Sequence, residues 1–125
     1  MLLDSNIIIY AAQIENIFLR DFIAENSPYV SAISYLEVLG YHQLMDEDKT
    51  YFQEFFTASQ ILPISQSVIN QAVKLKQLRK MSLGDAIIAG TALVYDLTVV
   101  TRNIDDFCWI TDLKLLNPFD DSANK

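Results

Sequence analysis

The chain has 125 residues, of which 51% are hydrophobic and 20% are charged, and its formal net charge is −7 at pH 7. This length suits one domain and is too short for two. A single cysteine excludes an intramolecular disulfide and a cysteine-based zinc cluster, and a single histidine excludes a multi-histidine metal site.

Short apolar segments alternate with longer segments of helical spacing from the first residue onward. The apolar segments predict strands at 1–4, 29–32, 61–64, 97–101 and 113–116. The segments between them predict helices at 7–12, 16–24, 34–44, 46–58, 65–80 and 83–95. Pro63 favours an edge position for the third strand, because proline cannot donate a ladder hydrogen bond. The helix at 83–95 is apolar on nearly every side, so we expect it to be buried.

Strands that alternate with helices and consist of continuous apolar runs are typical of a parallel sheet covered on both faces. We therefore expect an α/β protein with one domain over residues 1–119 and a polar, frayed tail at 120–125. No apolar run approaches the ~18 residues of a membrane span, and no targeting segment precedes Asp4. We expect a soluble, cytoplasmic protein that does not interact with membranes.

The acidic balance argues against a general nucleic-acid binder, whose binding face is basic. The positive charges are unevenly distributed, however, because four of the nine fall within seven residues, at Lys74, Lys76, Arg79 and Lys80. An acidic protein that contacts nucleic acid needs such a local stripe, a bound cation, or both. A solvated helix face is the ordinary explanation of the same stripe.

Acidic side chains follow the ends of several predicted strands. Asp4 ends the first strand, Glu37 lies near the start of the helix after the second, and Asp85 lies in the first turn of the helix before the fourth. Three more polar residues directly follow the fourth strand: Asn103, Asp105 and Asp106. Because ligands of an open parallel sheet bind at the carboxyl ends of its strands, we expect these groups to share one edge.

Several carboxylates can share a site only if their mutual repulsion is relieved. Two unit charges ~5 Å apart repel by about 3 kcal/mol at an effective dielectric near 20. A hard divalent cation, Mg²⁺ or Mn²⁺, is the usual counter-charge in an all-oxygen cluster. Such an ion polarises phosphate and activates water, so the pattern favours metal-assisted phosphodiester chemistry.

Helix capping is the ordinary explanation for each acid taken singly. Ser34-x-x-Glu37 and Ser82-x-x-Asp85 have the spacing of a capping box. Asp4 stands where it can cap the helix that follows it, and the aspartates after the fourth strand fit a solvated loop. A carboxylate can cap a helix and bind a metal through different oxygens, so both interpretations stay open.

Five motifs follow one another along nearly the whole chain: Leu3-Asp4-Ser5-Asn6-Ile7, the helix of Glu37, Leu83-Gly84-Asp85-Ala86-Ile87-Ile88-Ala89, Thr101-Arg102-Asn103-Ile104-Asp105-Asp106-Phe107, and Leu116-Asn117-Pro118-Phe119. Each motif is weak alone, but the ordered set resembles the PIN domain family, and most closely its VapC-type toxin branch. The resemblance implies a three-layer α/β/α sandwich with a central parallel sheet of about five strands.

The resemblance also implies a Mg²⁺- or Mn²⁺-dependent endoribonuclease that is the toxin of a toxin–antitoxin pair. Asp4, Glu37 and Asp85 would form the acidic metal site, with Asp4 and Asp85 as direct ligands and Glu37 completing the pocket or acting through water. The implied partners are the RNA substrate, a VapB-type antitoxin and a second copy of the chain in a homodimer.

One position departs from the family pattern. Many members have Thr-x-Asp after the fourth strand, whereas this chain has Thr101-Arg102-Asn103, and the neutral Asn103 is a weaker ligand. Asp105 or Asp106 is then expected to supply the missing charge, so all three residues are catalytic candidates. We expect three residues to contact the substrate: Asn6, Thr101 and Arg102, the last because a guanidinium suits phosphate oxygens.

Three other functions stay open. A nuclease of this family can act in RNA processing rather than as a toxin. The neutral Asn103 and the acidic balance also fit a catalytically silent binding module with the same fold. Asp4-x-Asn6 weakly resembles a phosphohydrolase motif, which generally has a second aspartate where Asn6 stands.

Overall fold

Five short parallel strands form one sheet at the centre of the molecule. The computed structural model describes residues 1–120, so all but the first residue of the tail expected at 120–125 lies outside the described part. The strands are β1 (Leu2–Leu3), β2 (Tyr29–Ser31), β3 (Ile61–Leu62), β4 (Val99–Val100) and β5 (Leu115–Leu116). Their order is β3-β2-β1-β4-β5, and every neighbouring pair is parallel. The edge position expected for the third strand is therefore confirmed.

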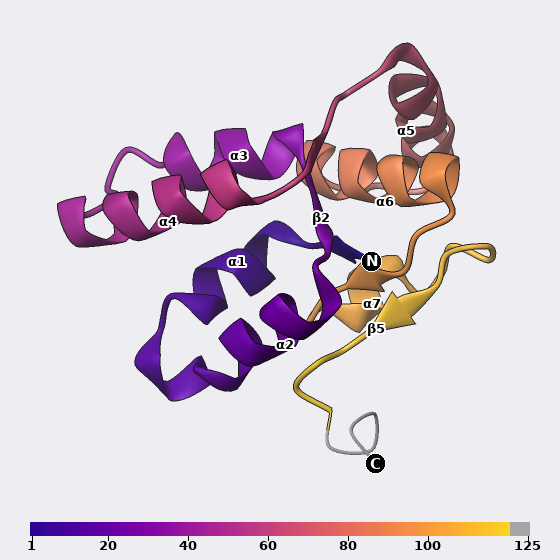
Figure 1. Ribbon diagram of the computed structural model, residues 1–125. Helices are drawn as coiled ribbons and strands as arrows, with labels where there is room; N and C mark the ends of the chain where they lie inside the picture. Colours follow the sequence, from indigo (N-terminus) through magenta and orange to yellow (C-terminus); the bar gives the residue numbers. More distant parts are fainter. Residues whose placement is uncertain (121–125) are drawn as a thin grey trace.

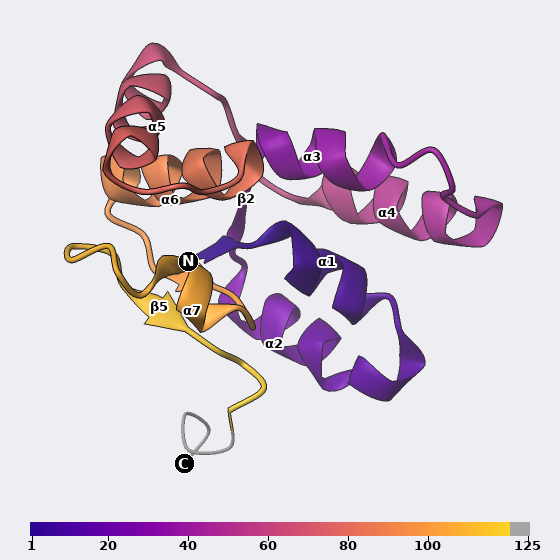
Figure 2. The ribbon, with the colours of Figure 1, turned by 180° about the vertical axis from the view of Figure 1, so that it is seen from behind.

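Helices fill most of the chain between the strands (Figure 1). They are α1 (Ser5–Ala11), a 3₁₀ turn η1 (Ile14–Asn16), α2 (Phe18–Asn26), α3 (Ala32–Leu39), α4 (Asp46–Ala58), α5 (Gln66–Leu78), α6 (Leu83–Tyr95) and α7 (Ile104–Phe107). Seen from behind, α3 and α4 lie side by side and extend outward next to α1 (Figure 2). Within residues 1–120, none of the helices has both the length and the apolar character to cross a membrane.

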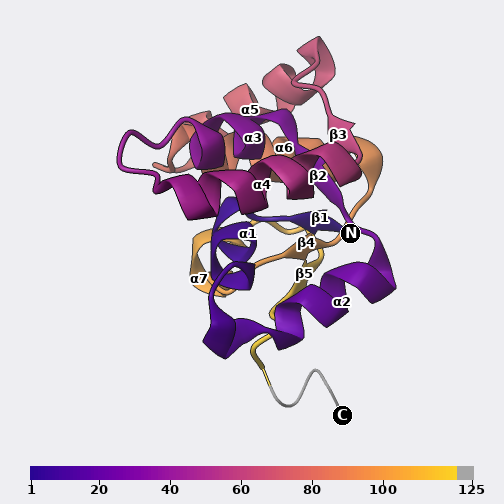
Figure 3. The ribbon, with the colours of Figure 1, turned by 60° about the vertical axis from the view of Figure 1, so that its left-hand side comes forward.

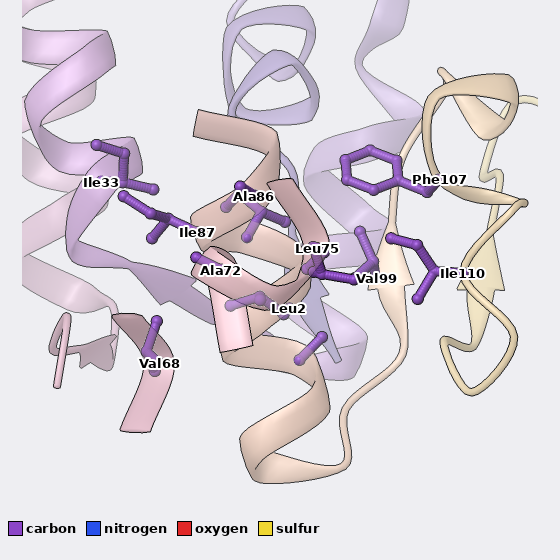
Figure 4. Close-up of a cluster of buried hydrophobic side chains, with 13 residues drawn as sticks. Leu2, Ile33, Val68, Ala72, Leu75, Ala86, Ile87, Val99, Phe107 and Ile110 are labelled. Atoms are coloured by element: carbon purple, nitrogen blue, oxygen red, sulfur yellow. The ribbon is translucent and has the colours of Figure 1, made fainter. Parts of the chain in front are cut away.

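Successive strand residues face opposite sides of the sheet. Leu2 and Val99 belong to a buried cluster with side chains of α5 and α6, part of which is drawn in Figure 4. Leu3 and Val100 belong to a second buried cluster with side chains of α1 and α4. Because side chains alternate along a strand, covering both faces requires apolar residues at every position. The resulting three-layer α/β/α sandwich has α5 and α6 on one side of the strands and α1 and α2 on the other (Figure 3).

The helix expected at 34–44 spans Ala32–Leu39 instead. Its N-cap is Ser31, whose hydroxyl oxygen accepts a hydrogen bond from the Ile33 amide at 3.1 Å. The helix ends at Gly40, which occupies the C-cap position. Ser34 therefore lies inside the helix, and the capping-box explanation of Glu37 is wrong.

A second correction concerns the segment after β4, which was expected to be a loop. It contains the four-residue helix α7, whose first turn carries Asp105 and Asp106. Three or four residues are too few for a hydrophobic period to be recognised in the sequence, which is why the helix was missed.

The close packing of α5 against α6 depends on Gly90. A Cβ atom at this position would lie 2.9 Å from the Val68 carbonyl oxygen and 3.3 Å from the Ala72 amide nitrogen. Both contacts are with backbone atoms of α5, so the whole helix would have to move to accommodate a side chain. Gly90 is itself surrounded by the buried residues of α6, from Ala86 to Ala92.

We expect Gly90→Ala to lower the free energy of unfolding by about 1 kcal/mol. Overpacking costs about 1–3 kcal/mol, whereas the better helix propensity of alanine recovers only about 1 kcal/mol. Urea denaturation measures the difference. Gly84→Ala in the same helix is the matched control, because its Cβ would meet only the end of the Glu37 side chain, 2.7 Å away at Oε2. Equal stability changes in the two variants would contradict the prediction.

Candidate active site

Asp4 and Thr101 meet where the strand order reverses. From β1 the chain continues to β2 and β3 on one side, whereas β4 and β5 lie on the other side of β1. Asp4 directly follows β1 and Thr101 directly follows β4, and the Thr101 hydroxyl donates to Asp4 Oδ2 at 2.8 Å. Open parallel sheets bind ligands at this switch point, beyond the carboxyl ends of the strands. The structure therefore places Asp4 at the carboxyl end of β1, where the sequence predicted it.

The Asp4 carboxyl group is almost enclosed, since the residue is only 5% exposed. Burial raises its pKa to about 6, the Thr101 hydrogen bond opposes that rise, and the charges of Asp85 and Glu37 add to it. Asp4 occupies the N-cap position of α1 but makes no side-chain capping hydrogen bond there. Helix capping consequently does not account for its position.

Glu37 reaches the same place from α3, where its side chain is exposed. The Ser5 hydroxyl donates to Glu37 Oε1 at 2.9 Å and lies 2.8 Å from the Ser34 hydroxyl oxygen. Ser5 and Ser34 are both buried. Because Ser5 directly follows Asp4, these bonds hold the Glu37 carboxylate beside the end of β1.

Ser5 and Ser34 are the site residues that the sequence analysis missed. Ser34 was interpreted as a cap, although it stands three residues before Glu37 and so shares its helix face. If the helix had been predicted to begin before Ser34, this three-residue spacing would have indicated that Ser34 and Glu37 lie together. Gly84 is a third such residue, because a Cβ there would collide with the Glu37 carboxylate.

At Asp85 the structure decides the capping question and places the carboxyl group among other acids. Its amide donates to the Ser82 hydroxyl oxygen at 3.1 Å, so the capping interpretation of Ser82 is confirmed. Its carboxyl group also lies near other acids. Burial raises the pKa of Asp85, the Ser82 hydrogen bond opposes this, and the charges of Asp106 and Glu37 add to the rise.

The residues after β4 differ in what they contact. The backbone amide of Asn103 donates to the Thr101 hydroxyl oxygen at 3.0 Å, so Asn103 supports the residue that is bonded to Asp4. Of the two aspartates of α7, Asp106 is the one whose charge acts on Asp85. A depression of about 340 Å³ is lined by Asn103, Asp105 and Asp106, together with Arg102 and Asn117.

Of the three residues expected to contact the substrate, Thr101 is buried and bonded to Asp4, whereas Asn6 and Arg102 are exposed. Asn6 is exposed in the first turn of α1. Arg102 is exposed as well, and its guanidinium carbon lies 4.2 Å from the ring centre of Phe119 and 5.3 Å from that of Tyr10. Cation–π contacts with two rings, which are themselves nearly perpendicular, hold the guanidinium in this position.

The structure thus brings together carboxylates from four elements that act on one another. The charges of Asp85 and Glu37 raise the pKa of Asp4, and the charges of Asp106 and Glu37 raise the pKa of Asp85. Among residues 1–120, no lysine or arginine forms an ion pair with any of these four groups. Their charge is therefore not balanced by a neighbouring side chain.

An all-oxygen set of this kind suits a hard divalent cation. In the described part of the chain, no three Asp, Glu, His or Cys side chains stand close enough together to enclose an ion. An ion here would therefore be held by only one or two of these carboxylates and would keep several waters, as Mg²⁺ usually does. Asp4 and Asp85 offer carboxylate oxygens for this, and the charge of Asp85 acts on Asp4.

Known proteins share this architecture. No curated protein matches the sequence. A chain of a toxin–antitoxin complex from Klebsiella pneumoniae is 28% identical with a TM-score of 0.74, over 95% of this chain and 98% of that chain. A chain of VapBC-1 from nontypeable Haemophilus influenzae is 25% identical with a TM-score of 0.75, over 93% and 96% of the two chains.

A third structure, DNA-bound VapBC from Salmonella typhimurium, has a TM-score of 0.79 at 21% identity and covers 92% of this chain and 95% of that chain, a similarity of fold alone. The sequence itself matches the PIN domain over residues 1–111. This match includes the Asp4, Glu37 and Asp85 motifs and both strands of the switch point. The chain therefore belongs to the PIN domain family.

Proposed function

We propose that this protein is a Mg²⁺- or Mn²⁺-dependent endoribonuclease and the toxin of a toxin–antitoxin pair. The observation that carries the proposal is the buried Asp4 carboxyl at the switch point, surrounded by the charges of Asp85 and Glu37. Membership of the PIN family supports the nuclease chemistry. The similar chain in a toxin–antitoxin complex from Klebsiella pneumoniae supports the role as a toxin.

In this proposal Asp4 and Asp85 would hold the cation directly, and Glu37 would complete the pocket or act through water. When bound, the ion supplies a Lewis acid for a phosphate oxygen and lowers the pKa of a bound water. Thr101 keeps the Asp4 carboxylate oriented through its 2.8 Å hydrogen bond. Ser5 does the same for Glu37 through its 2.9 Å bond.

Two exposed side chains, Arg102 and Asn6, are assigned to contacts with the substrate. Arg102 donates to phosphate oxygens from a position held by its contacts with Phe119 and Tyr10. Asn6 offers an exposed amide on the α1 side of the same carboxylates. Asp106 adds the negative charge that the neutral Asn103 does not supply, because it faces Asp85.

Exposed apolar surface beside the acids supports protein partners. A groove of about 490 Å³ runs from Glu37 along α1, α3 and the start of α4, and its wall includes Ile9, Tyr41 and Met45, which are 40%, 52% and 68% exposed. We assign a VapB-type antitoxin and a second copy of this chain as the partners that cover such surface. A toxin of this kind acts on cellular RNA, so we assign the protein to the cytoplasm.

A catalytically silent binding module is the second candidate. It is favoured by the neutral Asn103 and by the loose spacing of the carboxylates within residues 1–120. Metal binding separates the candidates, since a silent module has no need of the ion. Isothermal titration with Mn²⁺ at millimolar concentration makes this comparison directly.

The first prediction concerns cleavage. The purified chain, free of any antitoxin, is expected to cut structured RNA with Mg²⁺ or Mn²⁺ and to stop in EDTA. Asp4→Asn and Asp85→Asn are expected to lower the rate at least 100-fold, because each removes a charge that we assign to the metal site. Gel analysis of a labelled RNA gives the rates. Full activity in either variant contradicts the site assignment.

The two aspartates of α7 form a matched pair for a second prediction. Asp106→Asn is expected to lower the cleavage rate at least 10-fold, because Asp106 acts on Asp85. Asp105→Asn has the same chemistry one residue away and is expected to change the rate less than 2-fold. The reverse order would show that Asp105 supplies the charge at this corner of the site.

A third prediction follows from the buried Asp4. Its pKa is raised to about 6 from an ordinary value of 3.8, so the folded state binds more protons than the unfolded state between these values. Stability of the metal-free protein should therefore fall as pH rises from about 4 to about 7, by up to about 3 kcal/mol. Asp4→Asn removes this loss, so the variant should be the more stable protein at pH 8 and not at pH 4.

Urea denaturation in EDTA at pH 4, 6 and 8 measures the two stability curves. Millimolar Mn²⁺ at pH 8 should then stabilise the wild type and not Asp4→Asn, because a ligand stabilises only the state that binds it. Parallel curves for the two proteins, or an equal response to Mn²⁺, contradict the prediction.

A further inference from the structure

A second groove lies between α5 and the segment that follows α7. Its volume is about 490 Å³, and none of the carboxylates of the candidate active site lines it. The side chains of α5 and its C-cap provide one wall, with Lys74, Leu78 and Arg79 among them. Trp109 and Asp112 belong to the opposite wall.

The charge of this groove is opposite to that of the whole molecule. The chain carries −7 overall, yet the groove is lined by two cations, Lys74 and Arg79, against one acid, Asp112. Both cations are exposed, and they belong to the stripe at 74–80 that holds four of the nine positive charges. A polyanion is repelled by most of this protein and can bind only where the local charge is reversed.

An aromatic ring in a fixed position lies beside one of these cations. The Arg79 guanidinium carbon is 5.5 Å from the ring centre of Trp109. The indole N–H donates to the Asp106 carbonyl oxygen at 3.0 Å, which fixes the plane of the half-buried ring. Leu78, which is 76% exposed, adds apolar surface at the same end. Single-stranded nucleic acids bind where bases stack on such rings and phosphates meet nearby cations.

Two hydrogen bonds reach the acidic residues from this side of the molecule, one made by Trp109 of the groove and one by Lys76, which lies on α5 but does not line the groove. The first is the bond from Trp109 to Asp106, whose carboxylate acts on Asp85. In the second, Lys76 Nζ donates to the Met81 carbonyl oxygen at 2.8 Å, one residue before the Ser82 cap of Asp85. Both views of the ribbon place α5 next to α6 (Figures 1 and 2). The end of the groove at Trp109 and Arg79 therefore lies beside Asp106, and the groove continues along α5 as far as Gln71.

We propose that this groove binds a single-stranded part of the RNA substrate beyond the bond that is cut. Lys74 and Arg79 contact phosphates, and a base stacks on Trp109. The proposal rests on the proposed function and specifies the path of the strand. An acidic protein segment would match the charge equally well, but it has no nucleobase that stacks on the Trp109 ring. RNA therefore fits the full set of observations better.

Binding is measured in the Asp4→Asn background, where RNA is not consumed. Fluorescence anisotropy with a labelled, unstructured 12-nucleotide RNA, at several salt concentrations, gives the affinity and its salt dependence. Lys74→Gln with Arg79→Gln is expected to weaken binding about 10-fold and to lower the slope of log K against log salt by about 1.4, which corresponds to two lost phosphate contacts. Lys49→Gln, an exposed lysine on α4, is the matched control and is expected to change neither value.

The ring is tested separately from the charge. Trp109→Ala is expected to weaken RNA binding at least 5-fold, within the range measured for base stacking, and Trp109→Phe is expected to restore most of the affinity. The Phe variant keeps the test valid if the Ala variant folds poorly. RNA affinity unchanged in the charge variant and in the Phe and Ala variants overturns the proposal. Loss of binding to poly-glutamate, with RNA binding intact, also overturns it and identifies an acidic protein segment as the ligand.

Cleavage by the wild-type chain distinguishes this proposal from the one on which it rests. If the wild type cuts RNA and the groove variants cut it with an unchanged KM, the proposed function stands and the groove assignment fails. If the wild type does not cut RNA with any divalent cation, the proposed function fails. The anisotropy series then still decides whether RNA lies in the groove.

Discussion

The fold is organised around a carboxyl group that is taken out of water beside other carboxylates. Asp4 is buried at the end of the central strand β1, and burial together with the charges of Asp85 and Glu37 raises its pKa to about 6. Hydrogen bonds from the Thr101 hydroxyl and the Ser5 backbone amide favour the charged form and offset only part of this rise. Groups held at such a cost are concentrated at functional sites, because the same environment that disfavours the charge makes it available to a ligand. A cation is the ligand that relieves this arrangement most directly.

The sheet topology explains why groups so distant in the chain meet. Asp4 and Thr101 are 97 positions apart, yet β1 and β4 are paired, so both residues leave the sheet at the same edge. Glu37 and Asp85 come from the first helices after β2 and before β4. Gly84 allows the start of α6 to approach Glu37, since any Cβ there would collide with the carboxylate. Small and hydroxyl-bearing residues thus set the spacing of the acids.

The sequence was sufficient for the parallel sheet and for the position of Asp4 at the carboxyl edge of its strands, because both follow from general rules. Strands covered on two faces must be apolar throughout, and the carboxyl ends of parallel strands share one edge. It was insufficient where two local signals competed. Ser31 and Ser34 both had the chemistry of a cap, and only tertiary packing decided that Ser31 caps α3 while Ser34 contacts Ser5. The helix α7 was too short to have a readable period.

The neutral residue at position 103 can be understood from the same contacts. Asn103 acts on the site through its backbone amide, which donates to Thr101, and every residue except proline can provide that bond. An aspartate side chain here would add a further negative charge to a group of four carboxylates that already act on one another. Asp106, one turn along α7, already faces Asp85 from this side of the site. The departure from the family pattern therefore removes a charge on the side of the site where Asp106 carries one, and it leaves the hydrogen-bonded support of Asp4 intact.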